Sequence, residues 1–260
     1  MKPFHLTTIS SLAMLALGLK SDNRLFIAGG ISHAAYLMAT TAIPVDVLHP
    51  FNDFDELIKA FTDGAAEDET VVLADGIAFA TLGTIVEMDK VRATYFRTLY
   101  GTLDDTIKAF APDIASKLEH LPKVIAAIDK QIVILDIAST ATHLTTLDGD
   151  SAGQFDDLSG QIERFVASST VTEIAHLSER IFASVKGAVP AMSMFAAQRL
   201  KSVHAVLNQH IASKDDTGAA MGMLTETRPV VTLLDARIAE LDTGGQGEQL
   251  EEADGERKVA

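Results

Sequence analysis

The sequence predicts a mainly α-helical protein, folded as a bundle of about eight to ten helices. Three observations lead to this fold class. Apolar residues recur at the spacing of an amphipathic helix over most of the chain. A threonine followed three positions later by a glutamate marks helix starts at Thr84 and Thr170. Pro122, Pro190 and Pro229 each precede an apolar pattern, as proline does at helix starts.

Several helices are expected between residues 53 and 139. Asp53 is suited to cap the first of them, and Gly64 and Gly101 are suited to end helices. Pro112 should end or kink the helix before it, because proline has no backbone N–H donor. The apolar stripes are Phe54, Leu57, Ile58 and Phe61; Met88, Val91, Tyr95 and Leu99; Leu103, Ile107 and Phe110; and Val124, Ile128, Ile132 and Leu135.

Turn-forming residues at positions 140–153 separate two parts of the chain. After them, helices are expected near residues 155–165, 170–185, 190–212 and 229–241. The predicted organisation is an N-terminal part at 1–139, a C-terminal helical bundle at 154–242 and a flexible acidic tail at 243–260.

The first 90 residues allow a second interpretation, a small α/β element. Residues 25–30 end in Gly29 and Gly30 and could be a strand that enters a glycine turn. Residues 71–73 and 132–135 could be further short strands. Short apolar runs do not distinguish a buried strand from a buried helix, so both interpretations stay open at this point.

Acidic residues outnumber basic ones. The chain has 36 Asp and Glu against 21 Lys and Arg, a formal net charge of −15. Nucleic acids and anionic membrane surfaces are bound by clustered basic side chains, so neither is an expected partner. The absence of cysteine excludes disulfides, thiolate nucleophiles and cysteine-based zinc sites. No apolar stretch reaches the roughly 18–20 residues that span a bilayer.

An apolar run at residues 9–19 follows Met1 and Lys2, where a signal peptide would have its hydrophobic region. No small-residue cleavage site follows, because the run ends at Gly18 and Lys20. A buried first helix ended by Gly18 is therefore favoured over a signal peptide. A cytoplasmic or virion location is expected, with secretion as the alternative.

Gly29, Gly30 and Asp75 are the candidates for cofactor binding. A strand, a glycine turn and a helix start can hold a phosphate on backbone N–H groups. The segment lacks the third glycine of a dinucleotide fingerprint and the Gly-Lys-Ser/Thr of a P-loop. Ser32 is equally well explained as a helix cap. No cofactor is expected on balance.

Glu173 and His176 are the candidate metal ligands, because residues three apart on a helix can face the same ion. The chain has no second Glu-x-x-His, and Glu173 is already explained as the acid of a capping box. The segment 148–153 begins like a calcium loop but lacks two of its ligands. The sequence therefore predicts no metal site, and no catalytic motif is recognisable.

Met192, Met194 and Phe195 extend the apolar surface at the start of the longest predicted helix. Methionine fills irregular gaps in cores and adapts to partner surfaces. These three residues are therefore candidates for a subunit interface, with core packing as the other interpretation.

The expected function is a non-enzymatic structural or assembly protein that forms homo- or hetero-oligomers, with a component of a phage-type virion or other large particle as its most concrete form. The alternative is a small-ligand or nucleotide-binding enzyme with an α/β N-terminal half. Strand content in the first 90 residues distinguishes the two.

Overall fold

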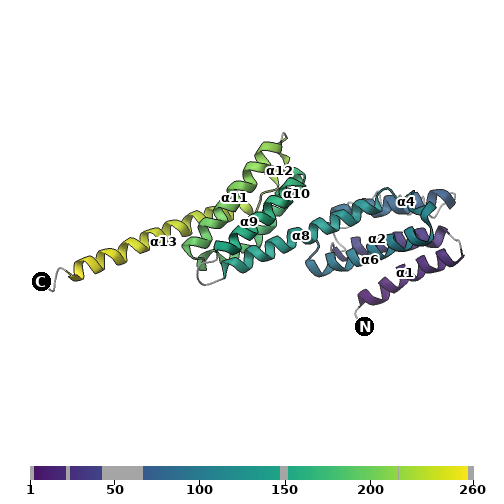
Figure 1. Cartoon of the computed structure of the whole chain (residues 1–260), viewed down its shortest axis with the longest axis horizontal. Coiled ribbons are helices and arrows are strands. Elements are labelled where there is room, and N and C mark those ends of the chain that lie inside the picture. The colour runs from purple at the N-terminus through teal and green to yellow at the C-terminus, as the bar shows by residue number, and fades with distance from the viewer. Residues whose placement is uncertain (1–2, 22–23, 43–66, 147–151, 216, 257–260) are drawn as a thin grey trace. The chain divides into compact units, whose positions relative to one another are not determined.

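The computed structural model describes residues 3–21, 24–42, 67–146, 152–215 and 217–256. Every regular element in these ranges is a helix, which confirms the predicted mainly α-helical fold (Figure 1). The chain divides into two compact units, Met1–Val133 and Ile134–Ala260, and the boundary falls within helix α8 (Leu121–Thr145). Within the described ranges, no helix combines the length and the apolar character needed to cross a bilayer.

The N-terminal unit is organised around α2, which contacts α1, α4, α5 and α6. The largest side chains buried in this unit include Tyr100, Phe96, Ile27, Ile31 and Met38. The helices of the unit are α1 (Pro3–Ser21), α2 (Arg24–Ala42), α4 (Glu67–Ala80), α5 (Leu82–Ile85), α6 (Lys90–Phe110), α7 (Pro112–Ala115) and the first half of α8.

The segments that could have been strands are helical. Gly29 and Gly30 lie inside α2, residues 71–73 lie inside α4, and residues 132–135 lie inside α8. The α/β interpretation is therefore wrong for the described residues. The ambiguity arose because apolar residues also occupy exposed positions on these helices, as Phe26, Val72 and Val133 do, so their sequences lack the polar face that marks a surface helix.

Helix α6 begins later than predicted. Asp89 caps it, and its carboxylate accepts a hydrogen bond from the backbone N–H of Arg92 at 2.8 Å. The predicted start at Thr84 is wrong, because the Thr84 hydroxyl donates to the carbonyl of Thr81 at 2.8 Å within the preceding turn.

Helix α6 also continues through Gly101, where the sequence predicted an end. Leu99, Tyr100 and Leu103 are buried around the glycine. Their packing outweighs the roughly 1 kcal/mol that a glycine costs inside a helix.

The effect of the prolines was predicted correctly, since α6 ends at Phe110 before Pro112 and α8 has Pro122 in its first turn. The helix predicted around residues 54–61 lies outside the described residues.

The C-terminal unit has one hydrophobic core, formed mainly by α8, α9, α10 and α11, to which α13 adds Val230 and Leu234. The predicted stripe Leu200, Val203, Leu207 and Ile211 is buried in it. Besides the second half of α8, the unit contains α9 (Ala152–Ala167), α10 (Val171–Val185), the short 3₁₀ helix η2 (Lys186–Ala191), α11 (Met194–Lys214), α12 (Ala219–Gly222) and α13 (Thr227–Glu256).

Two helix starts in this unit bear on the predictions. The capping box at Thr170 is confirmed, with both of its hydrogen bonds to and from Glu173 present. The longest predicted helix does not begin at Pro190, which lies in η2. Met192 has an extended backbone that interrupts the helix, and α11 begins after Ser193, whose hydroxyl accepts from the N–H of Ala196. Helix α13 extends into the predicted acidic tail at 243–260, and the flexibility of that tail stays a prediction.

Candidate functional site

Gly30 is a contact point between helices. A Cβ atom added at Gly30 would lie 2.9 Å from the carbonyl oxygen of Ser11 and 3.4 Å from the backbone nitrogen of Leu15, both on α1. The Ser11 hydroxyl also shares a hydrogen bond of 2.8 Å with Nδ1 of His33 on α2. The glycine therefore allows α1 and α2 to approach closely, and the buried Ser11 fixes how they pair.

At this position inside α2, Gly29 and Gly30 lack the geometry that phosphate binding requires. A phosphate is held by the free N–H groups of the first turn of a helix. Both glycines lie beyond the first turn of α2, which begins at Arg24. The predicted strand, glycine turn and helix start are therefore wrong for this segment.

Asp75, the third candidate, is buried in α4 with 2% of its surface exposed. Its Oδ1 accepts from the backbone N–H of Leu121 at 2.8 Å, and its Oδ2 accepts from the backbone N–H of His120 at 2.8 Å. Oδ2 also lies 2.9 Å from Nδ1 of His120. One carboxylate thus satisfies two backbone donors at the start of α8 and orients the imidazole beside them.

The surroundings of His120 are part aromatic and part charged. Its ring lies 4.5 Å from the ring of Phe79, centroid to centroid, and Nζ of Lys123 lies 5.7 Å from that same Phe79 ring. An Asp–His pair of this kind occurs in enzymes, where the carboxylate orients a histidine that transfers a proton. Here the same carboxylate is the N-terminal cap of α8, which is a complete structural reason for a buried acid at this position.

Glu173 and His176 lie on α10, as predicted. The Glu173 carboxylate accepts from the backbone N–H of Thr170 at 2.7 Å, so it is used as the acid of the capping box. His176 lies one turn further along the helix and is half-buried. The described residues contain no group of three or more His, Asp or Glu side chains placed to hold a metal ion.

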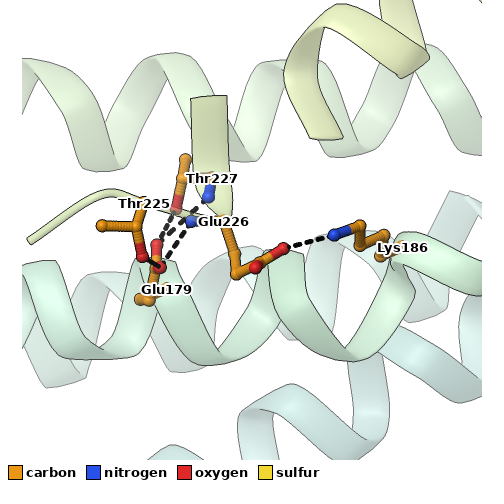
Figure 2. A network of polar contacts seen from close by, with 5 residues as sticks. All are labelled: Glu179, Lys186, Thr225, Glu226 and Thr227. Atoms are coloured by element: carbon orange, nitrogen blue, oxygen red, sulfur yellow. Dashed lines mark hydrogen bonds and ion pairs between the residues drawn. The ribbon is translucent and has the colours of Figure 1, made fainter. Parts of the chain in front are cut away.

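Glu179 lies one turn after His176 on α10. It has a structural role that no sequence motif indicates. It accepts hydrogen bonds from the hydroxyls of Thr225 at 2.6 Å and Thr227 at 2.9 Å. It also accepts from the backbone N–H groups of Glu226 and Thr227, at 2.5 and 3.1 Å (Figure 2). This carboxylate on α10 therefore caps the start of α13.

The capping network sets the charge state of Glu179. Partial burial raises the pKa of the carboxyl, but the hydrogen bonds from Thr225, Glu226 and Thr227 outweigh it, so the pKa lies below its ordinary value of 4.5. Beside this network, the Glu226 side chain accepts a hydrogen bond from Lys186 at 2.7 Å (Figure 2). That outer ion pair is exposed to solvent and contributes little to stability.

Asp215 repeats the arrangement on a smaller scale. Its Oδ2 accepts from the backbone N–H of Met221 at 2.9 Å, and its Oδ1 accepts from the hydroxyl of Thr217 at 3.2 Å. The Met221 hydrogen bond is the main reason that the pKa of Asp215 is lowered. Carboxylates of α4, α10 and the α11–α12 connection thus each hold backbone N–H groups.

The candidate interface residues surround one end of the C-terminal core. Met192 is fully buried, whereas Met194 and Phe195 are half-buried. The Phe195 ring packs edge-on against Phe155 at 5.8 Å, and the guanidinium of Arg199 lies 5.2 Å from its centroid. The interface prediction stays a prediction, and of the three residues only Met194 and Phe195 have surface to contribute to it.

A small cavity of about 70 Å³ lies between α9 and α11. Apolar and polar side chains both line it, so the space suits a few water molecules or one small group. It is lined by Phe155, Ser159, Ile162, Glu163, Arg199, Ser202, Val203 and Val206.

No protein-family model, no curated protein and no solved structure matches this chain.

Replacing the two glycines of α2 separately tests the helix contact. Gly30→Ala places a methyl group against the backbone of Ser11, which cannot move aside unless α1 shifts. We expect this change to lower the free energy of unfolding by about 1–3 kcal/mol. Gly29→Ala meets only Sδ of Met14 at 3.6 Å, and should leave stability unchanged or raise it by up to about 1 kcal/mol. Equal effects in urea denaturation would contradict the assigned contact.

The Glu179 network predicts a dependence of stability on pH. Because the pKa of Glu179 is lower in the folded chain, its stabilisation is complete above the unfolded-chain value of 4.5 and disappears as the pH falls through the folded value. Glu179→Gln should cost about 1–3 kcal/mol at pH 7, because it removes the charged acceptor of two backbone donors. The difference from the wild type should shrink below pH 4.5.

Glu226→Gln is the matched control for Glu179→Gln, since it removes only the exposed ion pair with Lys186. Its effect in the same denaturation experiments should stay below about 1 kcal/mol. A Glu179→Gln cost that is no larger than that of Glu226→Gln would show that the cap of α13 is unimportant.

Proposed function

We propose that this chain is a non-enzymatic structural or assembly protein that works in contact with other protein subunits. The observation that carries the proposal is the number of large apolar side chains exposed on the N-terminal unit. Contiguous exposed apolar surface on a soluble protein commonly marks a protein contact. The exposed residues of this unit are Leu17, Leu25, Phe26, Tyr36, Val72, Phe79, Val86, Val91, Phe110 and Val133.

The character of α1 and α2 supports the proposal. Both helices are apolar around most of their circumference. A helix of this kind is covered on more than one side in its working state. In the described part of the chain, side chains such as Leu17 and Phe26 remain about half exposed, so part of this surface is left for a partner to cover.

The hydrogen bonds of three buried or half-buried acids support the proposal as well. Asp75, Glu173 and Glu179 each accept hydrogen bonds from backbone N–H groups at the start of a helix. Each is therefore explained by the stability of the fold. The enzyme alternative depended on an α/β N-terminal half, and the helices at Gly29, Gly30 and Asp75 remove that basis.

The finer form of the proposal is a component of a large particle, such as a phage-type virion. An acidic chain without cysteine is compatible with such an assembly, and its partners would be copies of itself or other subunits.

Sedimentation of the native protein tests the proposal. Source cells or particles are lysed gently, and the protein is located by immunoblotting across a density gradient. We expect it to travel with complexes much larger than its own 27.7 kDa. Recovery of nearly all of it as a free chain of that mass would overturn the proposed assembly role.

A further inference from the structure

Helix α13 is attached to the C-terminal unit by few apolar side chains. Among its described residues, Val230 and Leu234 are the two apolar side chains fully buried in the core. Helices with few buried apolar contacts open at a lower free-energy cost than the rest of their unit. The shorter helix α10 buries Ile174, Ala175, Leu177, Ile181, Phe182 and Val185.

Polar contacts attach α13 to both α10 and α11. The Glu179 carboxylate of α10 accepts four hydrogen bonds from hydroxyl and backbone N–H groups of residues 225–227, at the start of α13. On α11, Nζ of Lys201 lies 2.5 Å from the carboxylate of Asp235. The Lys201 pair is exposed and contributes little, so the contact that matters most is the one at Glu179. Protonation of this one carboxylate weakens all four of its hydrogen bonds.

A half-buried histidine, His204 on α11, lies beside the same contacts. Its ring packs edge-on against the buried ring of Phe182 on α10, with 5.7 Å between the centroids. This burial lowers the pKa of the imidazole below its ordinary value of 6.5. Two charged groups act on the ring: Asp235 on α13 favours the imidazolium, and Lys201 on α11 opposes it. The neutral ring therefore fits the folded unit better than the charged ring.

Acid acts on both groups in the same direction. Because the pKa of His204 is lowered in the folded chain, its contribution to stability is complete above pH 6.5 and is lost as the pH falls from there to the folded value. The pKa of Glu179 is lowered as well, so its contribution is lost in the same way below pH 4.5. Falling pH first charges a ring beside α13 and then neutralises the carboxylate that caps α13.

We propose that α13 is a helix released by acid, which detaches from α10 and α11 between about pH 7 and pH 4 while α9, α10 and α11 stay folded. The release uncovers the part of the core against which Val230 and Leu234 pack. This inference goes beyond the proposed assembly role and does not depend on it, because it concerns contacts within the C-terminal unit.

Hydrogen exchange of the full-length chain tests the release. Protection factors, corrected for the intrinsic pH dependence of exchange, are compared between residues 228–241 of α13 and residues 155–166 of α9. We expect the protection of α13 to fall about tenfold or more relative to that of α9 between pH 7 and pH 4. Equal losses on the two helices, or no loss on α13, would overturn the proposal.

Variants show which group responds to acid. Glu179→Gln should lower the protection of α13 about tenfold at pH 7 and reduce its further loss below pH 4.5. His204→Gln should remove the part of the response that begins near pH 6.5. The matched controls are Glu226→Gln, which removes the exposed ion pair with Lys186, and His210→Gln on the same helix as His204. Both should respond to acid as the wild type does, and the same response in all four variants would contradict the assignment.

Single cysteines supply a second measure of the same opening. The chain has no cysteine, and Val230 on α13 and Val166 on α9 are both buried. Dithiodipyridine labels exposed thiols in acid as well as at neutral pH. The labelling rate of Val230→Cys relative to Val166→Cys should rise about tenfold between pH 7 and pH 4. A ratio that does not change with pH would overturn the release of α13.

Discussion

A helix that starts inside a protein leaves backbone N–H groups without partners in its own first turn. Leaving such donors buried and unpaired costs roughly 1–3 kcal/mol each. In this chain a carboxylate from another helix satisfies them in both units. Asp75 of α4 holds the start of α8, and Glu179 of α10 holds the start of α13. These two hydrogen-bonded carboxylates tie helices together that are far apart in the sequence.

The same constraint explains why acids that resemble functional groups occur inside the fold. A buried aspartate beside a histidine, or a glutamate among threonines, has the composition of a catalytic or metal site. The donors around Asp75 and Glu179 include backbone N–H groups, whose positions are set by the helices themselves. Close packing at Gly30 belongs to the same class of constraint, because it also fixes how two helices pair. Outside these contacts, large apolar side chains such as Leu17 and Phe26 stay exposed on the N-terminal unit.

The fold class and several helix ends could be predicted from the sequence because their signals are local. The box at Thr170 and Glu173 spans one turn, and Pro112 and Pro122 act on their own helices. The same local motif was misleading at Thr84, where the chain continues in a short turn before Asp89 starts α6. A motif of two residues does not show which of two nearby helix starts the packing of the folded chain favours.

The candidate sites were harder to predict because their partners are distant in the sequence. Asp75 was singled out, but its partners His120 and Leu121 lie 45 and 46 positions away. At Gly30 the local sequence predicts a turn, because the residue that it contacts, Ser11, lies on another helix. Glu179 belongs to no local sequence motif. The one hint in the sequence is the pair of threonines at positions 225 and 227, whose hydroxyls can donate to a carboxylate.

The measurement that tests this account most directly is hydrogen exchange at the start of α8 in Asp75→Asn, with Glu119→Gln as the control for an exposed acid beside the same helix start. The asparagine keeps the shape but has one acceptor oxygen for two backbone donors. We predict faster exchange at His120 and Leu121 and a loss of about 2–3 kcal/mol in the free energy of unfolding, against little change in the control. Exchange and stability equal to the wild type in Asp75→Asn would contradict the claim that this carboxylate holds the helix.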